Sequence, residues 1–457
     1  MDTFKINPID NVCVDLQSGH KIACQDINAG DDVIKYGMPI GQATTFIKSG
    51  DSVHSHNLKT KLGDLLNYKY SGGVEALPST EPFMIDAFVR KNGDIGIRND
   101  IFIIPTVGCV NSTAKAIANK TGAIHVAHPY GCSQLGDDMA VTQKVLKGLI
   151  KHPNAGGVLV LGLGCENNNI DEMKKVLGDI DTDRIRFLNT QDCSDELSEG
   201  VEIVTQLQRQ AANDVRQPVP VSRLKIGLKC GGSDGYSGIT ANPVVGVVTD
   251  KLVSMGATAV LTEVPEMFGA ETVLFERCEG EAIFNKCVAL INNFKQYFKD
   301  HGEPVSENPS PGNKEGGITT LEEKSLGCVQ KGGKAPVVDV LDYGDTVTKS
   351  GLNLVNGPGN DIVSVTNLTA CGCHMVLFTT GRGTPLGGIV PTIKIASNES
   401  IAQRKSNWID FCAYGFDHDK ISDALLDLIK DVANGKEAKN ELNDCREIAI
   451  FKDGVTL

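Results

Sequence analysis

The sequence of 457 residues lacks the features of a membrane or an exported protein. No apolar stretch approaches the roughly 20 residues that are needed to cross a bilayer. The first residues, Met1 to Ile6, do not form a basic segment followed by an apolar one, so no secretory signal is predicted. We therefore expect a cytoplasmic protein in which the 14 cysteines are mostly reduced thiols.

The sequence also lacks the charge and the glycine patterns that bind nucleic acids or nucleotides. The net charge is −13 and the pI is near 5.2, which argues against a nucleic-acid surface. Neither residues 162–167 nor residues 231–235 fit the Gly-x-Gly-x-x-Gly fingerprint, and no Gly-x-x-x-x-Gly-Lys-Ser/Thr loop occurs. Hydride-transfer and kinase chemistry are therefore disfavoured.

Aromatic residues are scarce, at 5%, whereas glycine is abundant, at 49 residues. This mixture suits α/β sheets with tight loops at the strand ends better than an all-β sandwich. The chain is too long for one ordinary hydrophobic core, so two or three domains are expected.

The sequence pattern divides the chain into four parts. Residues 1–66 contain short strands between turn signals and predict a small β domain. Residues 67–100 have little periodicity and predict a linker that ends in a hairpin. Strands and helices then alternate through 101–220 and 221–457, which predicts mostly parallel sheets covered by helices. Within the last part, the Gly- and Pro-rich residues 303–334 are interpreted as a long functional loop that lines the site.

Buried strands of the α/β parts are expected at regular intervals. They are predicted near residues 101–107, 123–128, 157–163, 185–189, 224–229, 258–263, 351–355, 375–380 and 391–396.

Four of these apolar runs stop at a small loop that carries a cysteine. The cysteines are Cys109, Cys132, Cys165 and Cys230. In an open parallel sheet, ligands bind beyond the carboxyl ends of the strands, so these residues can converge on one point. Thiolates suit a soft or borderline metal such as iron. The alternative is that each cysteine is merely a small hydrophobic residue, but four strand-end cysteines favour an active site.

Polar residues accompany these cysteines. Glu166 follows Cys165 and is a further candidate metal ligand, and three amide side chains are candidates for substrate binding: Asn111, Gln134 and Asn167.

Other candidate residues lie outside the cysteine loops. His54 and His56 follow a predicted strand, so they are expected to point the same way as an acid–base or metal-binding pair, with Asn57 beside them to hold substrate. Two exposed histidines at a domain edge are the equally weighted alternative. Glu263 at a strand end is a candidate general base.

Two cations follow later strands. Arg382 stands between glycines, and Lys394 ends another strand, so both could capture a substrate carboxylate. Ion pairs with nearby acidic residues are the alternative reading for both.

Seven runs of the sequence resemble the altronate dehydratase family, which also contains galactarate dehydratase and sulfolactate sulfo-lyase. They are residues 105–111, 130–138, 162–168, 230–235, 262–271, 308–313 and 381–385. Asp234 lies in the fourth run and is taken as a substrate-binding residue. The resemblance covers essentially the whole chain.

The resemblance implies a fold and a chemistry. It implies an N-terminal β-clip (SAF-like) domain and a large parallel-sheet α/β region with a Rossmann-like C-terminal part. The family pattern His-x-His-Asn falls on His54, His56 and Asn57. It further implies a homodimer, formed by helices of residues 101–220, and removal of water from a sugar acid with activation by Fe²⁺.

The leading hypothesis is dehydration of D-altronate to a 2-keto-3-deoxy acid, with iron held by Cys109, Cys132, Cys165 and Glu166. His54 or His56 would move protons, and Arg382 and Lys394 would hold the carboxylate. Galactarate or sulfolactate are alternative substrates. Mn²⁺ and an iron–sulfur cluster are alternative cofactors. A sugar-acid or metal-binding protein without catalytic activity is the alternative function.

Overall fold

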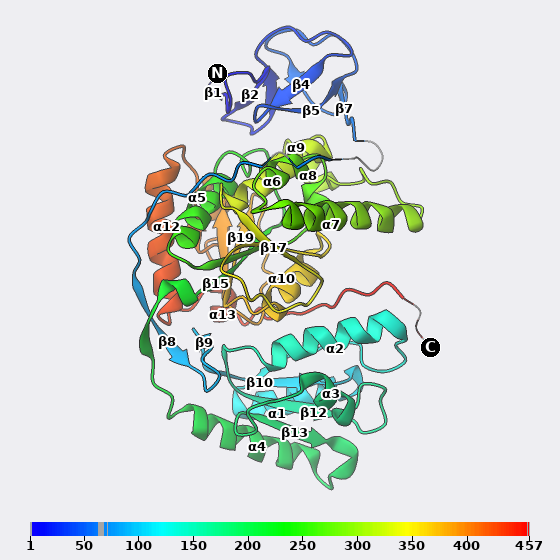
Figure 1. Ribbon diagram of the computed structural model, residues 1–457, viewed down its shortest axis with the longest axis vertical. Coiled ribbons are helices and arrows are strands. Elements are labelled where there is room, and N and C mark those ends of the chain that lie inside the picture. Colours follow the sequence, from blue (N-terminus) through cyan, green and yellow to red (C-terminus); the bar gives the residue numbers. More distant parts are fainter. Residues whose placement is uncertain (1, 63–67, 71, 455, 457) are drawn as a thin grey trace.

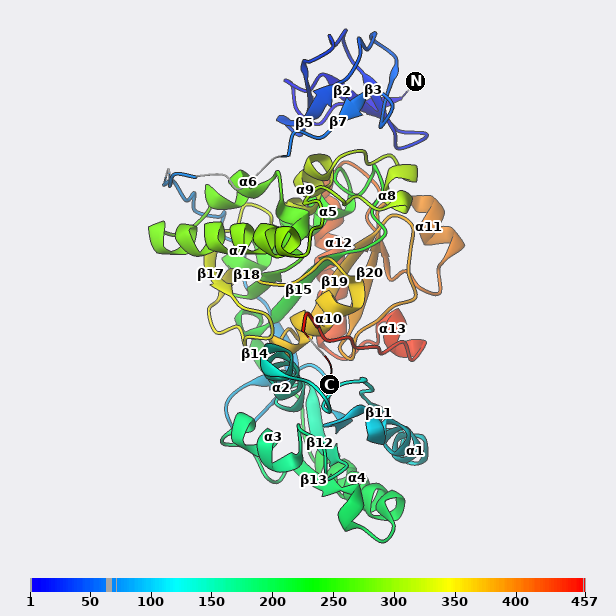
Figure 2. The ribbon, with the colours of Figure 1, turned by 90° about the vertical axis from the view of Figure 1, so that its right-hand side faces the viewer.

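The computed structural model describes residues 2–62, 68–70, 72–454 and 456, and it shows three domains arranged along the longest axis (Figure 1). A small β domain lies at one end, the C-terminal α/β domain in the middle and a second α/β domain at the other end (Figures 1 and 2). The predicted end of the first domain, at residue 66, lies outside the described residues.

The N-terminal domain consists of two small antiparallel sheets, with strand orders β1-β2-β3-β6 and β4-β5-β7. The strands are β1 (Thr3–Phe4), β2 (Val12–Asp15), β3 (Lys21–Ala23), β4 (Asp32–Lys35), β5 (Met38–Ala43), β6 (Ser52–Val53) and β7 (Leu58–Lys59). β5 approaches its neighbour β7 closely at Gly41, where φ is 144° and an added Cβ would lie 2.4 Å from the Lys59 carbonyl oxygen, so only glycine fits. The predicted small β-clip domain is confirmed.

The chain then passes along the outside of the C-terminal domain to a three-stranded sheet of order β14-β8-β9 (Figure 1). Its strands are β8 (Met84–Val89), β9 (Ile95–Gly96) and β14 (Gln217–Pro220). β8 precedes the second domain in the chain and β14 follows it. Because these two strands pair, the sheet joins the two ends of that domain.

The second domain is a four-stranded parallel sheet of order β11-β10-β12-β13 with helices on both faces. Its elements are β10 (Asp100–Pro105), α1 (Asn111–Thr121), β11 (Ile124–His125), α2 (Gly136–Ile150), β12 (Ala155–Gly162), α3 (Ile170–Leu177), β13 (Ile185–Asn189) and α4 (Glu196–Ala211). Along β10, Ile101 and Ile103 pack with α1 and α4, whereas Phe102 and Ile104 pack with α2 and α3. This alternation explains why the strand reads as a continuous apolar run.

The C-terminal domain is built on a seven-stranded parallel sheet of order β17-β18-β16-β15-β19-β20-β21. Its strands are β15 (Lys225–Cys230), β16 (Thr258–Leu261), β17 (Val337–Leu341), β18 (Gly351–Val355), β19 (Met375–Thr380), β20 (Thr392–Ala396) and β21 (Phe411–Cys412). Its helices are α5 (Ala241–Ser254), α6 (Glu271–Phe275), α7 (Glu281–Asp300), α8 (Pro311–Glu315), α9 (Leu321–Cys328), α10 (Asp361–Ala370), α11 (Glu399–Arg404), α12 (His418–Ala433) and α13 (Lys439–Leu442).

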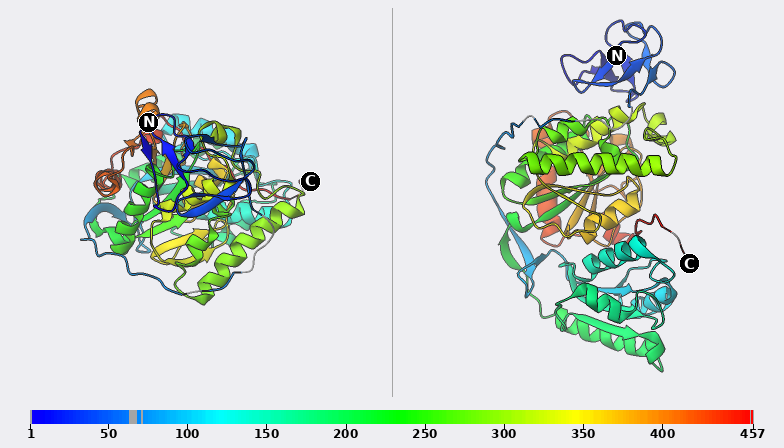
Figure 3. Two further views of the ribbon diagram at one scale, coloured as in Figure 1. Left: turned by 90° about the horizontal axis from the view of Figure 1, so that it is seen from above. Right: turned by 45° about the vertical axis from the view of Figure 1, so that its right-hand side comes forward.

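The two faces of this sheet are covered by different helices (Figure 3). Ile226 and Leu228 of β15 share a core with residues of α5 and α12. On the other face, Gly227 makes room for α10, because an added Cβ would lie 3.0 Å from the Leu368 side chain. The predicted parallel-sheet α/β class is confirmed.

Several details differ from the sequence-based expectations. β11 has only two residues, and β14, β17 and β21 were not predicted. Residues 303–334 are not an irregular loop, because they include α8 and α9. No helix among the described residues is long and apolar enough to cross a membrane.

The N-terminal domain is fixed to the C-terminal domain by a buried charge triad. Glu323 of α9 forms ion pairs with Lys21 and Lys35, each at 2.8 Å. Lys21 also donates to the Gly317 carbonyl and to Thr319. The same helix carries residues of the site described below, so the small domain supports the helix that helps to form it.

Candidate metal and active site

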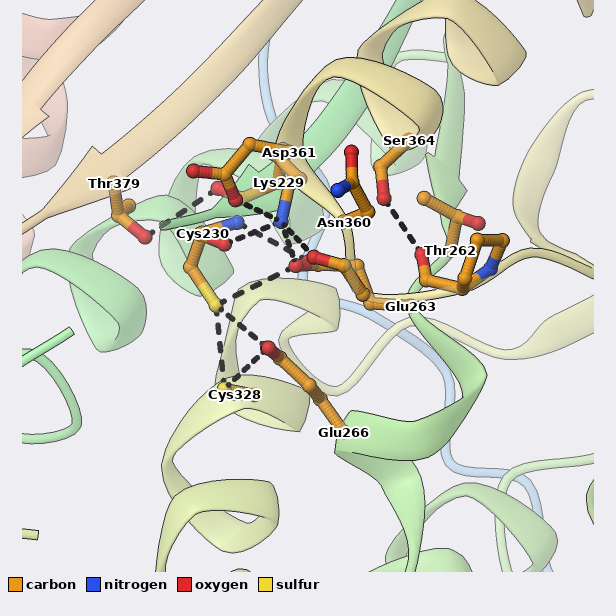
Figure 4. A network of polar contacts seen from close by, with 12 residues as sticks. Lys229, Cys230, Thr262, Glu263, Glu266, Cys328, Asn360, Asp361, Ser364 and Thr379 are labelled. Atoms are coloured by element: carbon orange, nitrogen blue, oxygen red, sulfur yellow. Dashed lines mark hydrogen bonds and ion pairs between the residues drawn. The ribbon is translucent and has the colours of Figure 1, made fainter. Parts of the chain in front are cut away.

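Three potential metal ligands meet at the carboxyl end of the seven-stranded sheet (Figure 4). Cys230 ends β15, Glu266 lies in the short 3-10 helix after β16, and Cys328 ends α9. The two Sγ atoms are 3.2 Å apart, and each lies 3.1 Å from Oε2 of Glu266. All three residues are buried. Among the described residues, this is the one group of three such ligand atoms within 4.8 Å of one another.

Three buried lysines surround this group. Lys331 Nζ lies 2.8 Å from the Sγ of Cys230, and Lys324 Nζ lies 2.9 Å from Oε1 of Glu266. Lys229 pairs with Asp361 at 3.0 Å. The group therefore combines nucleophilic and acidic side chains with cations in one buried network.

Glu263 binds two of these lysines, Lys229 and Lys331. Its carboxylate accepts hydrogen bonds from Lys229, from Lys331 at 3.2 Å and from the Cys230 amide at 3.1 Å. Its φ is 71°, in the left-handed region that a residue with a side chain rarely occupies. Strained backbone of this kind concentrates at functional sites.

The charged groups of the network shift one another's pKa values. Burial alone would raise the pKa of Glu266, but Lys324, Lys229 and Lys331 together hold it well below its usual value. The hydrogen bond with Cys230, followed by burial, raises the pKa of the Cys328 thiol. Without a metal, the Cys328 thiol therefore stays protonated while Glu266 stays ionised.

Burial raises the pKa of Glu263, and repulsion from Glu266 adds to this rise. For Lys331, burial acts to lower the pKa, but the nearby Cys230 and Glu263 raise it well above its usual value. The lysine stays positively charged and holds the anionic groups in place.

A cavity of about 550 Å³ opens above this network. It is lined by Cys230, Gly231, Gly232, Glu266, Asn308, Ser310, Asn313, Lys324, Gly359, Asn360, Asp361, Ile362, Thr384 and Leu386. β15 lies between β16 and β19, so the cavity occupies the point where the chain direction across the sheet reverses, which is the usual ligand site of such folds. Its lining carries charged side chains of both signs, Lys324 against Glu266 and Asp361.

The donor set fits a borderline metal. Two thiolates and one carboxylate are ligands that iron accepts. With both thiols deprotonated, five anionic groups (Cys230, Cys328, Glu263, Glu266 and Asp361) face three lysines. The surplus of two negative charges matches a divalent cation. The lysines then serve to hold the carboxylates rather than to exclude the metal.

Two predicted site residues of the C-terminal domain, Glu263 and Asp234, lie in different places. Glu263 lies in the network beneath the cavity. Asp234 is buried and accepts hydrogen bonds from Ser237, Ser397 and Asn398, so it joins the loops after β15 and β20. Burial raises its pKa.

The two cations that were predicted to bind the substrate carboxylate differ in their exposure to solvent. Arg382 is partly exposed and pairs with Glu315 at 2.9 Å, which is the alternative that the sequence left open. Lys394 is buried, with its ammonium 5.7 Å from the centre of the Phe378 ring. Burial lowers its pKa to about 8. Neither residue lines the 550 Å³ cavity.

The expectation that His54 and His56 share the face of a strand is wrong. Residues 54–57 form the turn between β6 and β7, where strand alternation does not apply. His54 Nε2 lies 2.9 Å from the Lys314 carbonyl oxygen, and burial lowers the pKa of His54. His56 is exposed. Asn57 bonds to His54 and Ser52 of its own turn, so its side chain shapes the turn.

The expectation that the four strand-end cysteines converge on one point is also wrong. Cys109, Cys132 and Cys165 lie at the carboxyl edge of the four-stranded sheet, whereas Cys230 belongs to the seven-stranded sheet. The three cysteines of the second domain are exposed and do not form a group within 4.8 Å.

The polar side chains beside these three cysteines form hydrogen bonds with neighbouring residues of the loops that carry the cysteines. Glu166 is buried and accepts from Thr106 at 2.6 Å and from the amides of Leu163 and Gly164. The amide groups of the three predicted substrate-binding residues bond to neighbouring backbone: Asn111 to His128, Gln134 to Gly131 and Asn167 to Ser133. In this structure these residues hold the cysteine loops together.

Sequence reasoning missed most of the buried network. Cys328, Lys324 and Lys331 lie on or just after α9, in a segment that was expected to be a loop. One sequence signal could have identified them, namely the density of charged and thiol residues in Leu321–Cys328. In the structure this segment is a helix whose residues are all buried.

Comparison with known proteins gives a consistent result along the chain. Three family profiles match: "Altronate/galactarate dehydratase SAF domain" at residues 11–61, "D-galactarate dehydratase/Altronate hydrolase, second domain" at 87–212 and "D-galactarate/Altronate dehydratase, C-terminal" at 221–456. The chain belongs to the D-galactarate/altronate dehydratase family.

Full-length relatives of the family are similar throughout. The chain is 51% identical to altronate dehydratase of Escherichia coli, with 100% of both chains covered. It is 50% identical to altronate dehydratase of Bacillus subtilis, over 97% of this chain and 93% of the relative. It is 31% identical to galactarate dehydratase (L-threo-forming) of Escherichia coli, over 92% of this chain and 87% of the relative.

Proposed function

We propose that this protein removes water from D-altronate to give 2-keto-3-deoxy-D-gluconate, with Fe²⁺ bound by Cys230, Cys328 and Glu266. The observation that carries the proposal is that two of these ligands and Lys324 line one polar cavity at the sheet edge. The 50–51% identity to two altronate dehydratases favours altronate over other sugar acids.

Substrate binding is assigned to the cation in the cavity. Burial opposes its charge, but Glu266 raises the pKa of Lys324, so it presents an ammonium to the substrate carboxylate. Lys324 is held in place by the side-chain oxygens of Asn308 at 3.0 Å and Asn313 at 3.2 Å. Neutralising the carboxylate makes the adjacent C2–H bond more acidic, which is the difficult part of the reaction.

Proton transfer is assigned to Asp361 at the start of α10. Its side chain is 35% exposed, lines the cavity and is paired with Lys229. As a carboxylate it takes the proton from C2, and as a carboxylic acid it returns that proton to the leaving C3 hydroxyl. Water leaves, and the enol that remains tautomerises to the ketone.

The bound metal would supply Lewis-acid stabilisation of the negative charge that develops on the substrate oxygens. Glu263, Lys229 and Lys331 keep the ligands in position. His54 and His56 have no direct part in this assignment, because neither residue lines the cavity.

The test is an anaerobic assay of the whole chain with D-altronate, galactarate or sulfolactate, with and without Fe²⁺ and thiol. We expect iron-dependent formation of the 2-keto-3-deoxy acid from D-altronate. Asp361→Asn should lose turnover while keeping iron, and exchange of the C2 hydrogen with solvent should disappear with it.

Other outcomes select among the alternatives. Faster turnover of galactarate, or release of sulfite from sulfolactate, would move the substrate assignment within the family. Tight binding of a sugar acid to the iron-loaded protein, with no turnover of any of the three, would replace the enzyme with a binding protein.

A further inference from the structure

The three cysteines of the second domain have no part in the proposed reaction, yet they lie at one junction. Cys109, Cys132 and Cys165 each follow a strand or strand-end loop of the same four-stranded sheet. Among the described residues, five cysteines are exposed: Cys24, Cys109, Cys132, Cys165 and Cys412. Exposed free thiols are prone to oxidation, so a concentration of three at one sheet edge calls for a function.

The loops that carry these cysteines are locked together by backbone contacts. We define the cysteine loops as residues 106–111, 128–134 and 163–168. The amide of Gly108 in the first loop donates to the Tyr130 carbonyl of the second at 2.9 Å, and the amide of Asn168 in the third donates to the Gly131 carbonyl at 2.9 Å. The second loop therefore lies between the other two.

The packing of these loops is too close for a side chain at the glycine before Cys132. Gly131 has a φ of 99°, and an added Cβ would lie 2.0 Å from the Thr106 carbonyl oxygen. Glu166 contributes a second lock, because it accepts from Thr106 of the first loop while it binds its own loop. The cysteines thus stand on a pre-formed frame rather than on mobile loops.

The electrostatic setting favours negative charge at this junction. Cys109 lies two residues before the start of α1, Cys132 lies four residues before the start of α2, and Cys165 lies five residues before the start of α3. Helix N-termini carry a partial positive charge. Polar hydrogens also approach the sulfurs, from Gln191 Nε2 at 3.4 Å to Cys165 and from the Ser133 hydroxyl at 3.9 Å to Cys132. Such donors stabilise thiolates and iron–sulfur centres.

The spacing of the sulfurs distinguishes between a single ion and a cluster. A tetrahedral ion with metal–sulfur bonds of roughly 2.3 Å needs its sulfurs about 3.8 Å apart. The three Sγ atoms here do not all lie within 4.8 Å of one another. In this arrangement the three sulfurs therefore do not all bind one such ion, whereas a cluster of several irons and sulfides is wider than one ion.

We propose that Cys109, Cys132 and Cys165 hold an iron–sulfur cluster at the carboxyl edge of the four-stranded sheet. Such clusters usually take four protein ligands, so a cluster with three thiolates keeps one iron open to a small anionic or hydroxyl ligand. This cluster is separate from the metal group of Cys230, Glu266 and Cys328 and does not depend on the proposed dehydration.

The test uses the full chain, purified and reconstituted anaerobically with Fe²⁺ and sulfide. We expect roughly four irons and four acid-labile sulfides per chain in addition to the iron of the C-terminal group, with broad absorbance in the visible range. Each of Cys109→Ser, Cys132→Ser and Cys165→Ser should lose the labile sulfide and the absorbance.

Matched variants separate this centre from other thiols. Cys412→Ser and Cys24→Ser remove exposed cysteines elsewhere and should keep the full sulfide content. Cys328→Ala should keep the sulfide but bind less iron. Iron without labile sulfide in the unaltered chain, or full sulfide content in Cys165→Ser, would overturn the proposal even if the dehydration assay succeeds.

Discussion

The two parallel sheets of this protein share one topological feature, but their carboxyl edges lie in different environments. In each, the first strand in sequence becomes an inner strand: β10 lies between β11 and β12, and β15 lies between β16 and β19. Both therefore open a crevice at their carboxyl edge. At β10 this edge carries three exposed thiols on interlocked loops, whereas at β15 it carries buried thiols, carboxylates and lysines.

The difference arises from what covers each edge. In the C-terminal domain, α8 and α9 lie over the strand ends, and α9 is pressed into place by the N-terminal domain through Lys21, Lys35 and Glu323 (Figure 2). The edge of the second domain is covered less, because the C-terminal segment pairs with Gln134 through Thr456 and binds Asp138 through Asp453 and Gly454, yet Cys109, Cys132 and Cys165 stay exposed. An inner first strand thus ends in a buried network of thiols, carboxylates and lysines in one domain and among exposed thiols in the other.

The largest effect is expected at the cation of the enclosed site. Lys324→Met should lower kcat/KM by roughly 10²–10³-fold, because it removes a preorganised charge from the developing anion. Lys295→Met is the matched control, since Lys295 is also buried and pairs with Glu271 at 2.8 Å, outside the cavity. Steady-state kinetics at saturating iron measure both, and equal losses in the two variants would contradict the assignment of Lys324.

The next effect concerns the metal. Cys328→Ala should weaken Fe²⁺ binding by roughly 10²-fold or more, as measured by anaerobic titration. Cys287 provides the control, because it too is buried and lies 3.4 Å from another thiol, Cys278, but no described residue completes a group of three ligands there. Cys287→Ala should keep the affinity. Loss of iron in both variants would show that burial alone, and not the ligand group, governs the result.

A third prediction tests the coupling between the small domain and α9. Burial alone would raise the pKa of Glu323, but Lys21 and Lys35 lower it to about 2. A carboxyl group with a lowered pKa contributes stability above its unfolded value near 4.5, and this contribution is lost as the pH falls from 4.5 towards 2. The shift corresponds to about 3 kcal/mol.

Unfolding followed between pH 2 and pH 7 should therefore show an acid-labile step that Glu323→Gln lacks, because that variant has already lost the pair. Glu315→Gln, at an exposed residue of α8, should retain the step. An identical pH profile for the unaltered chain and Glu323→Gln would contradict the coupling.

The smallest effect is expected at Arg382. Its pair with Glu315 is exposed, and such pairs contribute roughly 0–1 kcal/mol. Arg382→Gln should change KM by less than about 3-fold. A rise in KM of tenfold or more would instead support the sequence-based hypothesis that Arg382 captures the substrate carboxylate.

Apolar periodicity predicted the interior strands of both sheets well, since a buried parallel strand such as β12 or β19 reads as a continuous apolar run. The edge strands β17 and β21 were not predicted, because an edge strand is shorter or only partly buried. The predicted boundary at residue 220 already separates Cys230 from the other three cysteines, and the pairing of the strands shows that two sheets receive them.

The candidate site was predicted only in part. Cys230 and Glu263 were recognisable as strand-end residues, but their partners Cys328, Lys324 and Lys331 come from α9 and the turn after it. Glycine and proline before α9 concealed this helix, and its buried charges follow no amphipathic period. Only tertiary packing brings them to β15.

The most direct test of the contrast between the two edges is an iron-edge anomalous difference map from crystals grown anaerobically with Fe²⁺ and no added sulfide. We predict one peak, bounded by Cys230, Glu266 and Cys328, beneath the cavity that holds Lys324 and Asp361. Iron that occupies only the edge formed by Cys109, Cys132 and Cys165, with none at Cys230, would contradict the assignment of the catalytic metal to the C-terminal domain.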